Sequence, residues 1–312
     1  MDSKAPNTAD GNRGGRTDRT PAVVVGIDDS RAALRAAEWA AAEATARQLP
    51  LRLVQVVPAI DRPAFRLGGA RYRNAAGTLE NARWVIQARQ PVDAAANLLS
   101  IETSVVRGQP EQVLVEMSES AGLLVLGSSD IGFFQHMVLG STALAVTRDA
   151  HCPVALVRPC TVDDGAVLAV VSDRHTAGPA LLAAFRAAQD RGVDVIVARV
   201  WQGRPWSSSP EDWYTAAPVV PDAQILNCQR RFPDVPVSLV TMVGNAVAAI
   251  EQCSAAAQLV VVGHEADRDR PERLGRITHE LVCHAPCPVL VIPDRAEAAT
   301  ALLRTATSAV PQ

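Results

Sequence analysis

The sequence predicts an α/β fold made of two tandem, doubly wound domains, each with a five-stranded parallel sheet flanked by helices. Short apolar runs alternate along the chain with stretches typical of helices. The runs are continuously apolar rather than alternating, as in strands of a parallel sheet that is buried on both faces. The order of these runs repeats once within 312 residues, a length that suits two domains.

The first repeat begins with an apolar strand over residues 22–28, which ends in turn residues. Ser30 follows as a suitable N-cap, because its hydroxyl can accept a hydrogen bond from an unpaired amide of the first helical turn. An alanine-rich helix is therefore predicted over residues 31–47. The later predicted strands of this repeat are 51–57, 101–106, 123–126 and 154–157. The later predicted helices cover about 78–99, where Pro91 kinks or breaks the helix, and a segment that Gly108 and Pro110 open and that runs to about Ala121. A last helix begins at Ser141.

The second repeat follows the same order. Its predicted strands are 166–171, 193–200, 235–240, 259–262 and 289–292, and its predicted helices are 178–191, 223–231, 244–257 and 272–284. The closing segments of the two repeats, HCPVALVRP and PCPVLVIP, resemble each other residue by residue. We expect a flexible tail over residues 1–20, a first domain over 21–160, a second domain over 161–294 and a further tail over 295–312.

Composition excludes several function classes. The net charge is −3 and aromatic residues make up 4% of the chain, which argues against nucleic acid or an anionic membrane as a partner. No apolar run approaches the length of a membrane span, and residues 1–20 lack the apolar core of a targeting signal. The six cysteines form no paired framework, so we expect reduced thiols in a cytoplasmic protein and no metal site.

Two loops of the first repeat carry residues suited to a ligand. One contains Asp28, directly after the first strand, and the other runs from Gly127 to a predicted helix start at Ser141. A helix start presents unpaired amides and a positive dipole end, which favour a phosphate, and the hydroxyls of Ser141 and Thr142 can donate to phosphate oxygens. Asp28 is suited to a ribose hydroxyl or an adenine amino group.

From about residue 21 to 293, the layout resembles the universal stress protein family, whose ATP-binding members carry Gly-x2-Gly-x9-Gly-Ser/Thr after strand four. Gly127, Gly140 and Ser141 match this motif, and Asp28 matches the family's aspartate after strand one. The resemblance implies a strand order of 3-2-1-4-5, a backbone contact to adenine at Val56, and pairing of the fifth strands across a homodimer or within an internal pseudo-dimer.

The sequence departs from the family motif in both repeats. Asp130 stands where the second glycine is expected; near a phosphate its charge is unfavourable unless a Mg²⁺ ion bridges the two groups. In the second repeat Ala266 takes the corresponding position, and Gly275 is followed by Arg276 rather than by a hydroxyl residue. The charged loop around it is either a solvated surface or a place where Arg276 reaches an anionic partner.

The leading hypothesis is a cytoplasmic regulatory protein of a stress or dormancy response that binds ATP in its first domain. Its candidate ligand-binding residues are Asp28, Val56, Gly127, Asp130, Gly140, Ser141 and Thr142. The alternative is an interaction and dimerisation module of the same fold that binds no nucleotide. The sequence contains no nucleophile elbow, Walker motif or His-Glu-x-x-His motif, so we expect no enzyme, with weak ATP hydrolysis left open, and no catalytic or metal-binding residues.

Overall fold

The fold is described by a computed structural model. It covers residues 21–57, 88, 100–128, 140–160, 162, 164–171, 177–201, 223–243, 253–264 and 274–293. The elements of the first repeat are β1 (Ala22–Ile27), α1 (Arg31–Arg47), β2 (Leu51–Val57), β3 (Ile101–Arg107), α3 (Pro110–Ser118), β4 (Ala121–Gly127), α4 (Ser141–Asp149) and β5 (Val154–Val157). Those of the second repeat are β6 (Ala166–Val171), α5 (Ala177–Arg191), β7 (Val195–Trp201), α7 (Ala223–Arg231), β8 (Val237–Val243), β9 (Ala257–Gly263), α9 (Arg276–His284) and β10 (Val289–Ile292).

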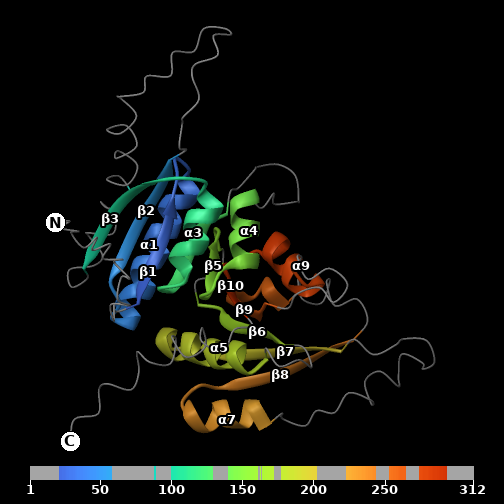
Figure 1. The fold of residues 1–312 in the computed structure, drawn as a ribbon. Coiled ribbons are helices and arrows are strands. Elements are labelled where there is room, and N and C mark those ends of the chain that lie inside the picture. Colours follow the sequence, from blue (N-terminus) through green and yellow to red (C-terminus); the bar gives the residue numbers. More distant parts are fainter. Residues whose placement is uncertain are drawn as a thin grey trace, which may run out of the picture.

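The strands form one ten-stranded sheet in the order β3-β2-β1-β4-β5-β10-β9-β6-β7-β8 (Figure 1). Each half of the sheet has the order 3-2-1-4-5, which confirms the predicted α/β fold with two tandem parallel units. The halves join through the antiparallel pair of β5 and β10, in which Ala155 lies opposite Leu290. The two repeats therefore form the internal pseudo-dimer that the resemblance implied.

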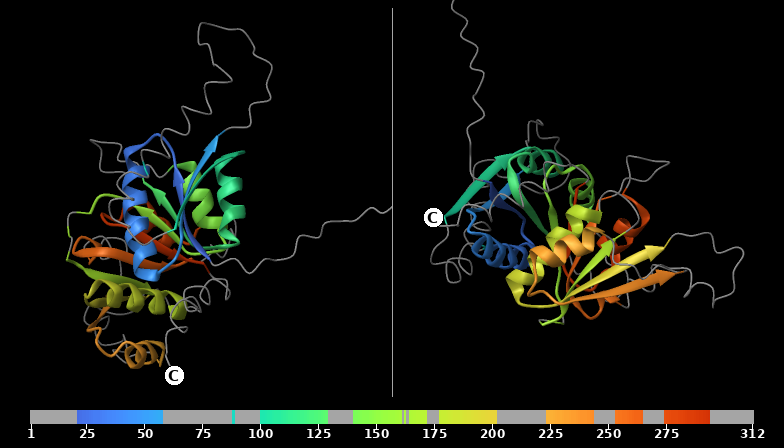
Figure 2. Two further views of the ribbon diagram at one scale, coloured as in Figure 1. Left: turned by 90° about the vertical axis from the view of Figure 1, so that its left-hand side faces the viewer. Right: turned by 90° about the horizontal axis from the view of Figure 1, so that it is seen from below.

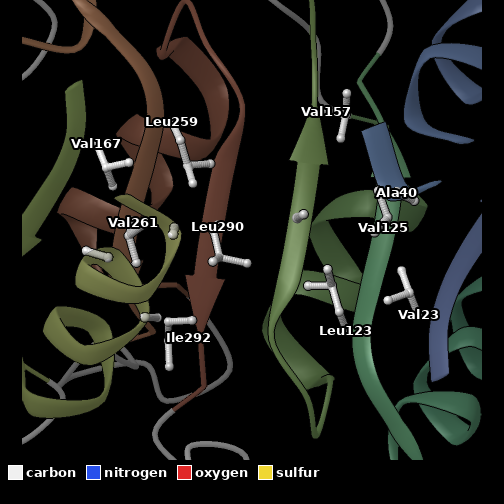
Figure 3. Packing of buried hydrophobic residues seen from close by; sticks show 14 of the residues in the cluster. Val23, Ala40, Leu123, Val125, Val157, Val167, Leu259, Val261, Leu290 and Ile292 are labelled. Carbon is white, nitrogen blue, oxygen red and sulfur yellow. The ribbon is translucent and has the colours of Figure 1, made fainter. Parts of the chain in front are cut away.

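The core lies on both faces of this sheet. One buried cluster joins α1, α5 and α7 to the strands, and the other joins α3, α4 and α9 to the opposite face. Alanines fill the inner sides of α1 and α5, which brings both helices close to the sheet. Figure 3 shows the first cluster from close by, with Val23 and Leu123 from one repeat and Val261 and Leu290 from the other.

Local sequence signals explain several element ends. The Ser30 hydroxyl accepts a hydrogen bond of 3.1 Å from the Ala33 amide at the start of α1, as predicted. The helix ends at Gln48, whose φ of 55° places it in the left-handed region that terminates a helix. At the sheet, β1 pairs with both β2 and β4, with Val25 opposite Leu53 and Val125.

Several predicted boundaries were off by one or two residues, and three elements have a boundary that was wrong by three or four residues. The helix that was expected to reach Ala121 ends at Ser118, because Ala121 already belongs to the buried strand β4. The strand predicted over 235–240 is β8 at Val237–Val243, which starts after Pro236. The helix predicted from residue 272 begins at Arg276, because Gly275 has an extended conformation and serves as its N-cap.

Other expectations lie largely outside the described residues. These are the predicted helices over 78–99 and 244–257 and the tails 1–20 and 295–312. No helix in the described part of the chain combines the length and apolar character needed to cross a membrane.

Candidate functional site

The candidate residues of the first repeat gather at the carboxyl edge of the sheet. Ile27 lies opposite Gln55 at the ends of β1 and β2, so Asp28 and Val56 follow in the next row. Gly127 ends the neighbouring strand β4, where it pairs with Val157 of β5. In open parallel sheets this edge is where ligands bind, beside the point where the strand order reverses.

Asp28 organises the turn between β1 and α1. One of its carboxylate oxygens accepts a hydrogen bond of 3.0 Å from the backbone amide of Ser30. The Ser30 hydroxyl in turn caps α1. Asp28 itself is exposed, so its carboxylate faces solvent at the sheet edge while its position is held by this turn.

Gly127 has a structural reason to be glycine. A Cβ added at this position would overlap the backbone carbonyl of Ala32 and lie 2.8 Å from the amide nitrogen of Ala33. Both atoms belong to the first turn of α1, which lies directly against the end of β4. Gly127 therefore permits a close approach of two backbones, and this approach brings the turn that holds Asp28 next to the end of β4.

Gly140 has different surroundings. It is the N-cap of α4, with φ −59° and ψ 146°, and no side chain among the described residues caps the helix there. Its carbonyl accepts a hydrogen bond of 3.1 Å from the Leu144 amide, so the amides of Ser141, Thr142 and Ala143 precede the first intrahelical donor. A Cβ added at Gly140 would meet nothing within 4 Å among the described atoms. Within the described part of the chain, the start of α4 is thus open to a group that needs hydrogen-bond donors.

Ser128 is a residue that sequence reasoning did not single out. It follows Gly127, and its amide donates a hydrogen bond of 2.8 Å to the Val157 carbonyl. The side chain is 2% exposed, and its hydroxyl has no hydrogen-bond partner in the part of the chain that is described. A buried hydroxyl without a partner is unfavourable. Its place in the loop after Gly127 was the available signal, but a serine in a polar loop does not indicate burial.

The structure thus brings Asp28, Val56 and Gly127 to one sheet edge, and places Gly140, Ser141 and Thr142 at an open helix start. Ser141 is exposed and Thr142 is half-buried. Asp130 lies outside the described residues.

The second repeat retains the backbone of the helix start without the motif. Gly275 caps α9 with φ −57° and ψ 151°, close to the values at Gly140, and again no side chain caps the helix. Here the buried hydroxyl of Thr278 donates a hydrogen bond of 3.0 Å to the Gly263 carbonyl, which ties α9 to the end of β9. The corresponding residue of α4 is Ala143, which cannot make this bond. The two helix starts therefore have similar backbone angles, and the hydrogen bond from Thr278 is a feature of α9.

The cysteines of the strand-five segments are not suited to nucleophilic chemistry. Cys152 and Cys287 occupy corresponding buried positions, and desolvation raises the pKa of each thiol to about 12. A thiol with so high a pKa stays protonated at neutral pH. Cys152, which follows His151 in the sequence, is therefore a packed residue of the core. Among the described residues, no group of three or more His, Cys, Asp or Glu side chains could hold a metal ion.

Comparison with known proteins matches the whole two-repeat layout. Residues 21–158 and 165–293 each match the model of the universal stress protein family. The chain is 31% identical over 278 residues to universal stress protein Rv2624c of Mycobacterium tuberculosis H37Rv, covering 86% of this chain and 95% of that protein. It is 32% identical over 284 residues to Rv2005c of the same strain, covering 86% and 96%. A universal stress protein from Archaeoglobus fulgidus DSM 4304 has the same fold, with a TM-score of 0.68 at 16% identity over 89% of this chain and all of that one.

Proposed function

This chain belongs to the universal stress protein family, and we propose that its first repeat binds ATP as a regulatory ligand in a stress or dormancy response. The observation that carries this proposal is the start of α4 at Gly140, which follows β4 along the chain and is open among the described residues. Uncapped amides and the positive end of the helix dipole are suited to a phosphate chain.

Each candidate residue has a distinct role in this proposal. The amides of the first turn of α4 and the hydroxyls of Ser141 and Thr142 donate to phosphate oxygens. Asp28, exposed at the end of β1, accepts from a ribose hydroxyl or from the adenine amino group. The backbone at Val56 contacts the adenine ring, as the family resemblance implies.

The remaining members of the site control how closely a nucleotide can approach. Gly127 leaves room for the close approach of α1 to β4, and the buried Ser128 hydroxyl offers a further polar group beside it. Asp130 is proposed to meet the phosphates through a bridging Mg²⁺ ion, because the ion reverses an otherwise repulsive interaction. ATP acts here as a bound ligand, and its binding requires no catalytic residue.

We further propose a cytoplasmic location. All six cysteines are free thiols, the state expected in a reducing compartment.

Native mass spectrometry with MgATP tests the nucleotide proposal. We expect one ATP per wild-type chain. In the variant Gly140→Glu, a carboxylate at the open start of α4 repels the phosphates, and we expect no bound ATP. The matched control is Gly275→Glu, which makes the same change at the corresponding N-cap of α9, where the backbone angles are nearly the same. This variant should bind one ATP.

Circular dichroism of both variants checks that they fold. Equal ATP binding by wild type and Gly140→Glu would show that the site is wrongly assigned. Absence of ATP from the wild-type spectrum would contradict the proposal and would favour the interaction module that binds no nucleotide.

A further inference from the structure

The outermost strands of the sheet, β3 and β8, differ in chemistry. The resemblance implied pairing of two chains through strand five, but here β5 and β10 pair with each other inside one chain. That pair leaves β3 and β8 as the two edge strands of the sheet in the described part of the chain. β3 carries charged residues along its length, and Glu102 forms an ion pair of 2.9 Å with Arg52 of the neighbouring strand. β8, with the sequence VSLVTMV, carries no charged residue. Charges protect an edge strand against pairing with another chain, and β8 lacks them.

Exposed apolar side chains concentrate at the β8 end of the molecule. Four large hydrophobic residues are exposed in the described part of the chain, and three of them are Leu226, Leu239 and Val240. Leu226 belongs to α7, which packs against α5 and whose buried residues share a core cluster with Val197 of β7. Leu239 and Val240 are 40% and 37% exposed on β8 itself, although a strand of this kind is normally buried on at least one face.

The backbone of β8 has a regular set of groups that face away from the sheet. The Val195 amide of β7 donates a hydrogen bond of 2.9 Å to the Pro236 carbonyl, which sets the phase of the β7–β8 pairing. In a parallel strand, the backbone amide and carbonyl of one residue point to one neighbouring strand, and those of the next residue point to the opposite side. The backbone groups of Ser238, Val240 and Met242 therefore face β7. The amides and carbonyls of Val237, Leu239, Thr241 and Val243 then point away from β7, to a side where the described residues supply no further strand. Figure 2 shows β8 as the last strand at this end of the sheet.

We propose that two copies of this chain pair antiparallel through their β8 strands. The two copies are related by a two-fold axis that passes between their Val240 residues. This register is the one in which all seven residues of the strand find a partner. Val237 then pairs with Val243 of the second copy, and Leu239 with Thr241, so that every outward amide and carbonyl of β8 is satisfied. Val240 lies opposite itself, in the closer, non-hydrogen-bonded type of pair.

The same symmetry explains the exposed side chains. The two-fold axis is perpendicular to the sheet, so a given face of one copy continues as the same face of the second copy. Leu239 aligns with Val197, whose side chain belongs to the core cluster that contains α7 residues, so Leu239 and α7 lie on one face. Pairing brings these apolar groups of both copies together, and no like charges meet along β8. This inference does not depend on nucleotide binding.

Sedimentation equilibrium of the full chain over a range of concentrations tests the proposal. Wild type should reach twice the mass of one chain. Leu239→Pro removes an outward amide without removing a hydrogen bond to β7, and it should sediment as a single chain. The matched control is Val105→Pro on β3. Val105 is 39% exposed, and its amide also points outward, because the Leu51 amide bonds to the Ser100 carbonyl. This control should remain dimeric.

A cysteine cross-link tests the register. Val240→Cys places two thiols opposite each other on the two-fold axis, at a Cα separation of about 4.5 Å that suits a disulfide. Mild oxidation should therefore link two chains, whereas Leu239→Cys and wild type should stay unlinked. The proposal is overturned if wild type sediments as one chain, if Leu239→Pro stays dimeric, if Val105→Pro dissociates as Leu239→Pro does, or if Val240→Cys links no better than Leu239→Cys.

Discussion

Gly127 and Gly140 belong to one motif but serve different purposes. At Gly127 the missing side chain lets the backbone of α1 approach β4, and an added Cβ would overlap the Ala32 carbonyl. At Gly140 an added Cβ would meet no described atom within 4 Å. The first glycine therefore supports the fold, and the second keeps a helix start open. Motif spacing alone cannot separate these two reasons.

Alanine at each glycine should reveal the difference. Gly127→Ala forces two backbone segments apart, and we expect it to lower the free energy of unfolding by about 1 to 3 kcal/mol. Gly140→Ala has room and compatible backbone angles, so its cost should stay below about 1 kcal/mol, the usual loss at an N-cap. Urea denaturation followed by circular dichroism measures both. Equal losses would mean that Gly127 has no special packing role.

Among the elements, the strands could be predicted best. Four of the predicted strands, 51–57, 154–157, 166–171 and 289–292, agree with β2, β5, β6 and β10 in both bounds, because a mainly apolar run with turn residues on both sides leaves little choice. The starts of α1, α4 and α7 were also predicted correctly, whereas the start of α9 at Arg276 was missed, because an N-cap glycine is also a common loop residue. The open start of α4 was predictable from Gly140 and Ser141. The burial of Ser128 was not, since it depends on segments that meet only in the folded sheet.

Arg158 connects two elements from different repeats. It follows β5, is 2% exposed, and donates to two carbonyls at the end of α9, at 2.7 Å to Ala285 and 2.6 Å to Val282. The last carbonyls of a helix lack intrahelical donors and carry the negative end of its dipole, so a buried guanidinium satisfies both requirements. The corresponding residue in the second repeat is Pro293, which has no donor to offer α4.

We expect Arg158→Met to lower the free energy of unfolding by about 1.5 to 3 kcal/mol, the range for hydrogen bonds to a charged group. Methionine fills similar space but leaves two buried carbonyls without these donors. The control is Arg186→Met, which removes an ion pair of 3.1 Å to Asp190 at the surface of α5 and should cost under about 1 kcal/mol. Guanidinium chloride titration compares the variants, and a loss at Arg158 no larger than at Arg186 would argue against a role in joining the repeats.

The two repeats pack together as one body. Both buried clusters contain residues from each repeat, so neither half has a separate core. Across the junction, the buried Glu43 of α1 forms ion pairs with Arg47 of the same helix and with Arg191 at the end of α5. The Arg191 guanidinium also lies 5.9 Å from the ring centre of Trp39. We therefore expect the two repeats to unfold in one transition, which allows a single free energy of unfolding to be assigned at each pH.

That free energy should fall at alkaline pH because of two corresponding thiols. Burial raises the pKa of Cys152 and Cys287 from 9.0 to about 12 in the folded chain. Between these values the unfolded chain loses both protons and the folded chain keeps them. The stability that the two buried thiols contribute is therefore complete below pH 9 and is lost as pH rises towards 12.

Denaturant unfolding at pH 8 and pH 10 measures the effect, which should be a loss of about 3 kcal/mol, shared about equally by the two thiols. The variant Cys152→Ala/Cys287→Ala should lose most of this pH dependence, whatever its stability at pH 8. Burial shifts the pKa of Cys228 and Cys283 in the same direction, so part of the dependence should remain. Few other groups titrate in this range, because the chain has two tyrosines and a single lysine, Lys4. Burial of the two thiols on both sides of the β5–β10 junction should prevent their ionisation in the folded chain. An unchanged pH dependence in the double variant would therefore mean that these thiols ionise in the folded chain as readily as in the unfolded one.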